Sequence, residues 1–219
     1  MAFNGFSEET YRFFMELRYN NNKEFFHANE DRYRKFVRTP MTELVKELLP
    51  TMLAIDPGMD TRMMTIVSRM NRDTRFSKNK LPYRDHMWFG TRDIGKSVSE
   101  CYVLYAEISP EGYGYGMGMW DGNREIMNPL RERILAKPNE FLELVNDKRL
   151  DRFIMTGDSY KKDKIKDAPE ELKPYLNLKS IGFTYSSPML KRTFTHEFKD
   201  EIEQAFIDLS QLYRFIKGL

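Results

Sequence analysis

The chain has 219 residues, of which 41% are hydrophobic and 31% charged, and its formal net charge is +2. This composition excludes a disordered chain and suits one core of ordinary size. No apolar run approaches the ~18 residues of a membrane-spanning helix, and the N-terminus lacks the regions of a signal peptide. The single cysteine, Cys101, cannot form an internal disulfide and is expected to be a buried thiol. We therefore expect a cytoplasmic protein with no membrane partner.

The first third of the chain predicts helices. Ser7 precedes two glutamates and resembles an N-cap, so a helix should begin there. Three asparagines at 20–22 form a turn, and Asn22 is the expected cap of a second helix. Thr39-Pro40 predicts the start of a third helix, because the apolar residues of 41–52 recur at helical spacing. The turn formers of 56–58 end this helix.

The middle third predicts a sheet, because β-branched and aromatic residues recur in short runs between turn formers. The tetrapeptide Ser109-Pro110-Glu111-Gly112 suits a turn, so the runs beside it should pair as an antiparallel hairpin near 100–120. The expected strands cover roughly 62–69, 84–92, 100–108 and 113–120.

The last of these strands carries glycine at every second position. Gly114, Gly116 and Gly118 share one face, since side chains alternate along a strand. A face without side chains lets either a helix or a ligand approach the backbone closely. Close packing of a helix is the simpler expectation, and a ligand is the alternative.

The last third again predicts helices. Asn128-Pro129 and Lys137-Pro138 indicate the starts of two short helices, and residues 198–216 form a strong amphipathic helix. The charged stretch 161–164 should be a loop, and 180–185 could add a strand. The order of elements predicts an α+β fold, with N-terminal helices, a central, mainly antiparallel sheet and C-terminal helices packed on one sheet face. We expect residues 1–219 to form a single domain.

Positive charge is concentrated in one part of the chain. Residues 62–96 hold nine Lys/Arg against three acids, a balance of +6. Crowded cations need acids, water or a bound anion, and arginine and lysine suit phosphate or carboxylate. In the opposing interpretation Asp73 pairs with Arg72 or Arg75 and the lysines face solvent. The candidate anion-binding residues are Arg69, Arg72, Arg75, Ser77, Lys78, Lys80 and Arg84.

Several residues are candidate neighbours of this segment. His86 is the best candidate acid or base, because imidazole titrates near neutral pH, although a structural histidine is the alternative. No Cys/His set has zinc spacing, and the common nucleotide-binding and hydrolase motifs are absent, so no metal or cofactor is assigned. The possible neighbours are Asn21, Asn22, Lys23, Asp73, Tyr83 and His86.

Four short motifs support a family resemblance. They are Phe3-x-Gly5-Phe6, Asn21-Asn22-Lys23-Glu24-Phe25-Phe26, Arg72-Asp73-x-Arg75-Phe76-Ser77-Lys78-x-Lys80-x-Pro82-Tyr83 and Gly116-x-Gly118-x-Trp120. Together they resemble the family called domain of unknown function 2461. The resemblance implies one full-length domain, directs attention to the same residues and implies no chemistry. It weakens after residue 155, where the chain has Asp167-Ala168-Pro169-Glu170-Glu171 in place of the usual Pro-x-Gly-Tyr element.

Three classes of function remain open from the sequence. The leading hypothesis is a basic pocket that binds a small anionic ligand bearing phosphate or carboxylate. The second is an enzyme that acts on an anionic substrate with His86 or Asp73 as acid or base. The third is a scaffold or interaction protein without a small-molecule site. Nucleic acid is a weaker candidate partner, because the basic segment is short and no nucleic-acid motif accompanies it.

Overall fold

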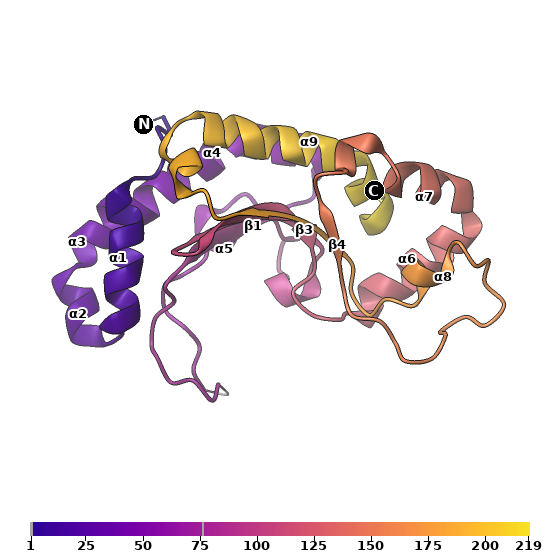
Figure 1. Ribbon diagram of the computed structural model, residues 1–219, viewed down its shortest axis with the longest axis horizontal. Coiled ribbons are helices and arrows are strands. Elements are labelled where there is room, and N and C mark those ends of the chain that lie inside the picture. The colour runs from indigo at the N-terminus through magenta and orange to yellow at the C-terminus, as the bar shows by residue number, and fades with distance from the viewer. Residues whose placement is uncertain (1, 76) are drawn as a thin grey trace.

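A computed structural model describes residues 2–75 and 77–219, and it has helices at both ends of the chain and a sheet between them (Figure 1). The sheet is open, fully antiparallel and five-stranded, with the order β1-β2-β3-β5-β4. The predicted α+β fold is confirmed. The strands are β1 (Met87–Gly90), β2 (Val103–Ser109), β3 (Gly112–Gly118), β4 (Ile154–Thr156) and β5 (Gly182–Ser187).

The N-terminal third is helical, as predicted. Asn22 caps the second helix, because its side chain accepts a hydrogen bond from the Phe25 backbone N–H at 2.8 Å. The third predicted helix begins at Thr39 as expected, and a π-helical turn, Arg34–Arg38, leads directly into it. The helices are α1 (Glu8–Tyr19), α2 (Lys23–Ala28), α3 (Glu30–Tyr33), α4 (Thr39–Ile55) and α5 (Met63–Ile66).

The strand predicted at 62–69 is wrong for most of its length. The Asp60 carboxylate accepts a hydrogen bond from the Arg62 backbone N–H at 2.9 Å, which turns the chain into the short helix α5. Only the end of the run contacts the sheet, where Val67 forms a single antiparallel bridge to Phe89. The expected hairpin is confirmed, because β2 and β3 pair along their whole length, from Val103–Gly118 to Ser109–Gly112.

The C-terminal third departs from the prediction at Pro129, and it also contains a short strand and a short helix that were not predicted, β4 and α8. The helix expected to start near Asn128 begins earlier, because the Asn123 side chain caps it through the Glu125 backbone N–H at 2.8 Å. Pro129 therefore lies inside this helix. The helices are α6 (Arg124–Ala136), α7 (Pro138–Val145), α8 (Lys173–Leu176) and α9 (Glu197–Lys217), and 3-10 turns cover Val98–Glu100, Lys148–Leu150 and Leu190–Phe194.

One face of the sheet carries the core. The helices α4 and α9 lie side by side over it (Figure 1). From β3, Tyr113 packs edge-on against Phe198 of α9 at a centroid distance of 5.0 Å, and Tyr115 is fully buried. Cys101 is buried as expected. No helix in the described part of the chain is long and apolar enough to cross a membrane.

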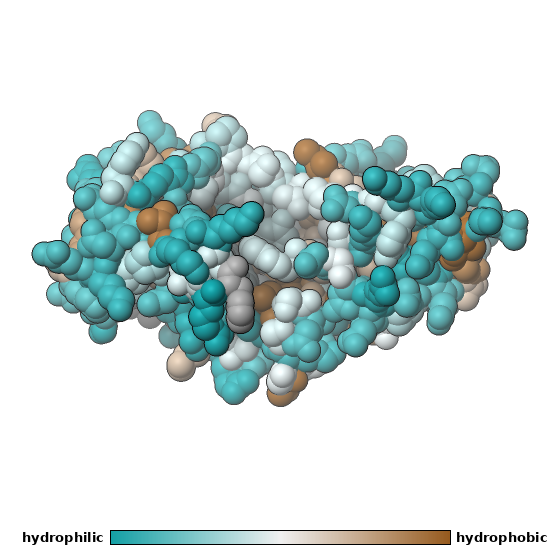
Figure 2. Space-filling model, turned by 90° about the horizontal axis from the view of Figure 1, so that it is seen from below, coloured by the Kyte–Doolittle hydropathy of each residue, from teal (hydrophilic) through white to brown (hydrophobic). Residues whose placement is uncertain are grey.

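The opposite face of the sheet is open. Gly114 and Gly118 of β3 line surface hollows there instead of contacting a helix, so the helix expected on the glycine face is absent from the described residues. The segment between α5 and β1 lies below one side of the sheet, and α6 and α8 lie below the other side (Figure 1). Seen from below, a pale hollow lies between hydrophilic rims (Figure 2). A site on this face therefore has the segment after α5 on one side and the α6–α8 region on the other.

Candidate functional site

The arginine cleft, as we call it, is a depression of about 620 Å³ at one side of the open face. Asp73 is the one acidic residue in its lining. A lining with five guanidinium groups and one carboxylate gives this part of the surface a positive potential. The arginines that line the cleft are Arg69, Arg72, Arg75, Arg84 and Arg92.

The backbone of the basic segment folds back on itself and so fixes the cleft. The Arg72 N–H donates to the Pro82 carbonyl, and the Arg84 N–H donates to the Met70 carbonyl, both at 2.8 Å. The Arg84 side chain donates to the carbonyls of Arg69 and Asn71, also at 2.8 Å. Burial, and then the charge of Arg72, lowers the pKa of Arg84. Arg84 therefore holds the two halves of the segment together, and its guanidinium group is only partly hydrated.

The Asp73 carboxylate pairs with Arg75, as the opposing interpretation of the sequence proposed. The Arg75 guanidinium donates to both Asp73 carboxylate oxygens, and these bonds hold the pKa of Asp73 down at about 2. Arg72 contacts Ser77 instead, at 3.5 Å. The Arg69 side chain makes no hydrogen bond or ion pair with another described residue. Of the predicted arginines, Arg69, Arg72 and Arg84 thus make no ion pair with a carboxylate of the described residues.

The predicted lysines do not join the arginines. Lys80 donates to the Thr74 carbonyl at 2.9 Å, and Lys78 is exposed. Neither lines the arginine cleft. Phe76, between these groups in the sequence motif, lies outside the described residues. The structure therefore brings four of the seven predicted anion-binding residues, the arginines, into one lining and leaves Ser77, Lys78 and Lys80 outside it.

Arg92 was missed by the sequence analysis as a site residue. It belongs to the cleft lining, and its Nε is buried without a hydrogen-bond partner among the described residues. Burial lowers the pKa of Arg92, although Cys101 and Asp60 act in the opposite direction. The alternation of side chains along β1 and the residues after it could have identified Arg92, because every second position, 88, 90 and 92, lies on the same face of the strand.

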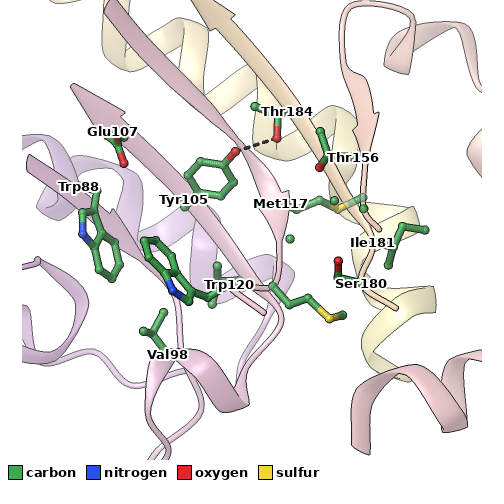
Figure 3. A pocket seen from close by; sticks show the side chains of 15 residues that line it. Trp88, Val98, Tyr105, Glu107, Met117, Trp120, Thr156, Ser180, Ile181 and Thr184 are labelled. Carbon is green, nitrogen blue, oxygen red and sulfur yellow. Dashed lines mark hydrogen bonds between the residues drawn. The ribbon is translucent and has the colours of Figure 1, made fainter. Parts of the chain in front are cut away.

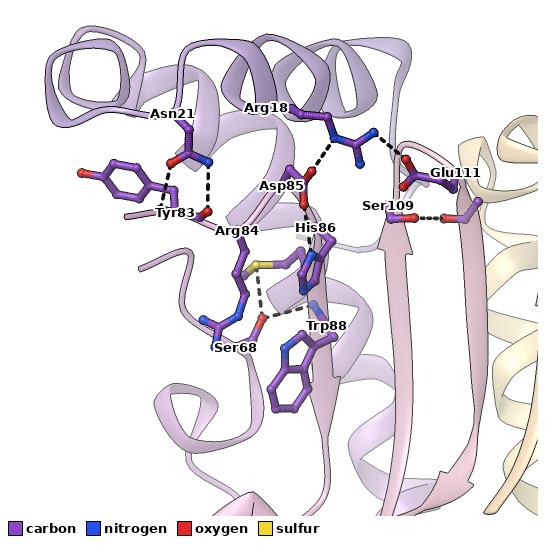
Figure 4. A network of polar contacts seen from close by, with 12 residues as sticks. Arg18, Asn21, Ser68, Tyr83, Arg84, Asp85, His86, Trp88, Ser109 and Glu111 are labelled. Atoms are coloured by element: carbon purple, nitrogen blue, oxygen red, sulfur yellow. Dashed lines mark hydrogen bonds and ion pairs between the residues drawn. The ribbon is translucent and has the colours of Figure 1, made fainter. Parts of the chain in front are cut away.

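Trp88 contributes a second unpartnered donor to the same lining. Its Nε1 is buried and has no acceptor among the described residues. The Ser68 hydroxyl does not bind the indole, because it accepts the Trp88 backbone N–H at 3.1 Å and donates to the Met87 sulfur at 3.6 Å (Figure 4). Two residues of the cleft lining therefore each carry a buried N–H group without an acceptor among the described residues, one on an indole and one on a guanidinium.

The predicted neighbours have different positions. Asn21 ties the basic segment to the α1–α2 turn, because it exchanges two hydrogen bonds of 3.0 Å with the Tyr83 backbone (Figure 4). Asn22 is the cap of α2, and Lys23 begins that helix. Neither Asn22 nor Lys23 lines a hollow beside the arginines. Asn21 is therefore a positioning residue, and the other two belong to the helix.

His86 lines a depression of about 390 Å³ next to the arginine cleft. The depression and the cleft share three lining residues, Arg72, Asp73 and Arg84. The Asp85 carboxylate lies 3.3 Å from His86 Nδ1, and Arg18 holds that carboxylate from α1 (Figure 4). This contact orients the imidazole, as a carboxylate does for a histidine that exchanges protons.

The tryptophan pocket, as we call it, is a hollow of about 330 Å³ over the middle of the open face. Trp120 and Tyr105 stand on one side of it, and Ile181 stands on the other (Figure 3). The hydroxyl groups of Tyr105 and Thr184 bond to each other at 2.8 Å. Two stacked indole rings, an apolar wall and a hydroxyl pair give this pocket a mixed lining suited to a small organic molecule.

Glu107 is an acidic residue of this face. It lines both the tryptophan pocket and the adjoining depression over Gly112 and Gly114. Burial raises its pKa, against the opposing effect of His86, and Asp85 raises it further. Its carboxylate makes no hydrogen bond or ion pair with another described residue. Glu107 is thus a half-buried carboxyl group, available to a ligand as an acceptor or as an acid.

The comparison with known families covers nearly the whole of this architecture. Residues 9–215 match the family described as conserved hypothetical protein (DUF2461). The chain belongs to this family. The resemblance seen in the sequence motifs is therefore confirmed, and the DUF2461 match extends beyond residue 155, where those motifs weaken. No curated protein matches the chain.

The DUF2461 match spans every strand of the sheet and both walls of the open face. It includes the arginine cleft, the Asp85–His86 pair and the tryptophan pocket. No group of three or more His, Cys, Asp or Glu in the described residues could hold a metal ion. The described site therefore offers guanidinium groups, an oriented imidazole, a carboxyl group and indole rings.

Proposed function

We propose that this protein binds a small anionic ligand, bearing phosphate or carboxylate, in the arginine cleft. The observation that carries the proposal is the pair of unpartnered donors, Trp88 Nε1 and Arg92 Nε, in one lining. A buried N–H without an acceptor costs about 1–3 kcal/mol, and an anion supplies acceptor oxygens. Both groups are covered, so ligand binding should shift these side chains.

The charge of the cleft supports the same proposal. Arg69 and Arg72 have no carboxylate partner among the described residues, and burial lowers the pKa of both Arg84 and Arg92. Guanidinium groups that repel one another and lack full hydration gain from a counterion. A phosphate or carboxylate meets this need because it accepts two parallel hydrogen bonds from one guanidinium.

The test is calorimetry with phosphate, pyrophosphate and citrate at low salt. We expect at least one of them to bind, and Arg69→Ala or Arg72→Ala to weaken that affinity roughly tenfold or more. Arg149→Ala is the matched control, since this arginine pairs with Asp147 away from the cleft. Failure of all three anions to bind the native protein, or equal affinity in every variant, would disprove the proposal.

A second candidate function is proton transfer on the bound anion, with His86 as the acid or base. The contact of Asp85 with His86 Nδ1 favours it, because Nε2 is then the nitrogen left for a substrate. Asp73 suits this role less, since Arg75 already holds its carboxylate. The test is turnover of phosphorylated metabolites followed by NMR. His86→Gln should abolish turnover while it keeps anion affinity, and turnover that survives the change would exclude His86.

A further inference from the structure

The arginine cleft and the tryptophan pocket are neighbours through shared side chains. Trp88 lines both of them. Trp120 lines the tryptophan pocket and also the depression that Arg72 and Arg84 line. The guanidinium groups therefore line depressions that adjoin the pocket lined by the two indole rings.

Trp120 presents a ring face to the pocket. Its indole stacks on that of Trp88, with centroids 6.3 Å apart and planes 24° from parallel. The residue is nevertheless 73% exposed. Because Trp88 covers one side of the ring, the exposed side faces the hollow (Figure 3). An exposed indole face at the edge of a pocket is a stacking platform for a flat ring.

The floor of the tryptophan pocket suits a flat molecule with a polar edge. Gly118 and Gly182, on neighbouring strands, contribute no side chain to it. The Glu107 carboxylate has no partner among the described residues, and the hydroxyl groups of Tyr105 and Thr184 lie nearby (Figure 3). A ring that carries N–H or amino groups could donate to Glu107 and lie flat on the glycines.

We propose that the ligand is a nucleoside monophosphate, whose base stacks on Trp120 while its phosphate lies in the arginine cleft. Glu107 accepts a hydrogen bond from the base. This inference rests on the proposed function, because it assigns the phosphate to the same arginines. It adds the class of the ligand to that proposal, because an aromatic platform beside a cationic cleft favours a molecule with a flat ring and a negative charge.

Fluorescence titration tests the inference, because both tryptophans of the chain, Trp88 and Trp120, line the pocket. The probes are AMP, GMP, CMP and UMP, with ribose 5-phosphate as the anion without a base and adenosine as the base without an anion. We expect at least one nucleotide to quench the fluorescence and to bind roughly tenfold or more tightly than ribose 5-phosphate.

Trp120→Ala should reduce nucleotide affinity to that of ribose 5-phosphate and leave ribose 5-phosphate affinity unchanged, as measured by calorimetry. Trp120→Phe should keep most of the nucleotide affinity, because phenylalanine still stacks. Tyr19→Ala is the matched control, since Tyr19 is an aromatic residue, 80% exposed, that lines neither the pocket nor the cleft.

The outcomes separate this inference from the proposed function. If ribose 5-phosphate binds in an Arg72-dependent manner and no nucleotide binds more tightly, the inference fails and anion binding stands. If no anion binds, both fail. Adenosine binding as tightly as AMP would overturn the link between pocket and cleft. A single-stranded oligonucleotide that binds far more tightly than every mononucleotide would also overturn it, since the ligand would then be a nucleic acid.

Discussion

The Nε of Arg18, on α1, lies 2.5 Å from the Asp85 carboxylate, one residue before His86. A second nitrogen of the same guanidinium lies 2.5 Å from Glu111 in the β2–β3 turn. One side chain thus joins the N-terminal helices, the entry to β1 and the hairpin. Burial alone would raise the pKa of Asp85, but the hydrogen bonds from Arg18 and His86 outweigh it and lower that pKa.

Asp85→Asn should reduce the free energy of unfolding at pH 7 by about 1 kcal/mol, because the pair is only partly buried. A lowered pKa in the folded state gives stability that is present above the unfolded pKa of about 3.9 and is lost as the pH falls through the folded pKa. Urea unfolding at several pH values should therefore show the two proteins converging below pH ~3.9.

The control for Asp85→Asn is Glu30→Gln, which removes the exposed partner of Arg34. Its effect on the free energy of unfolding should be small at every pH, since an exposed pair contributes little. A difference between Asp85→Asn and native protein that stays constant from pH 7 to pH 3 would exclude the ion pair as its cause.

Among the charged residues, Lys217 should be the one whose substitution lowers the free energy of unfolding most. Its ammonium lies 2.5 Å from Asp56 and 2.6 Å from Asp93, and both Lys217 and Asp56 have almost no exposed side chain. Lys217→Met leaves the Asp56 carboxylate buried without its cation, so we expect a loss of about 3–5 kcal/mol by chemical denaturation. Lys137→Met, at an exposed pair with Glu140, is the control and should change little.

The pH dependence gives a second measurement on Lys217. Burial lowers its pKa, but the hydrogen bonds to Asp56 and Asp93 outweigh burial and raise it. The stability from a raised lysine pKa is fully present below the unfolded value of about 10.4 and is lost as the pH rises through the folded pKa. Native protein should lose this stability at alkaline pH, and Lys217→Met should not.

Gly116→Ala tests the backbone of β3. Gly116 has a φ of +157°, and a Cβ there would lie 2.0 Å from the Phe183 carbonyl oxygen on β5. Because that oxygen belongs to the sheet backbone, the strands must separate, and we expect a loss of about 3 kcal/mol or more. Gly58→Ala is the control, since its Cβ would meet only Asp56 at 3.7 Å. Equal melting temperatures for the two variants would contradict this account.

Glu107→Gln should stabilise the ligand-free protein near neutral pH. Burial raises the pKa of Glu107, so the ionised carboxylate destabilises the folded state. A carboxyl whose folded pKa lies above its unfolded value of about 4.3 lowers stability as the pH rises between the two values. Urea unfolding should show a gain at pH 7.5 that disappears below pH ~4, and Glu132→Gln, at an exposed position of α6, should show neither.

Local patterns in the sequence predicted much of the fold. Asn22 is a cap because its side chain reaches a backbone N–H three residues on, and the β2–β3 hairpin follows from one turn between two alternating runs. The long helix at 198–216 follows from apolar spacing alone, and α9 differs from it by one residue at each end. All three features depend on residues close together in the chain.

The errors in the predicted fold arose at two positions, one where tertiary packing outweighed a local signal and one where a local hydrogen bond did. Pro129 lacks an N–H and is typical of a helix start, yet α6 continues through it because Leu130 and Ile134 are buried in the core. The run at 62–69 is rich in strand formers, but the hydrogen bond from Arg62 to Asp60 starts a helix there.

The site was predictable only in part. The arginines of 69–84 could be found from charge, because they are close in sequence. Arg92 and Trp120 join them only through the sheet, where β1 and the end of β3 lie on either side of β2. Glu107 is one of many acids in the sequence, and only its place on the open face distinguishes it.

The position of α9 has a consequence for synthesis on the ribosome. This helix covers the apolar face of the sheet beside α4, yet it is made after all five strands. Until α9 emerges, Tyr113, Tyr115 and their neighbours have no helix from the C-terminal part to bury them. Premature termination before α9 should therefore give aggregation-prone fragments that need chaperones, and folding should be completed only late in translation.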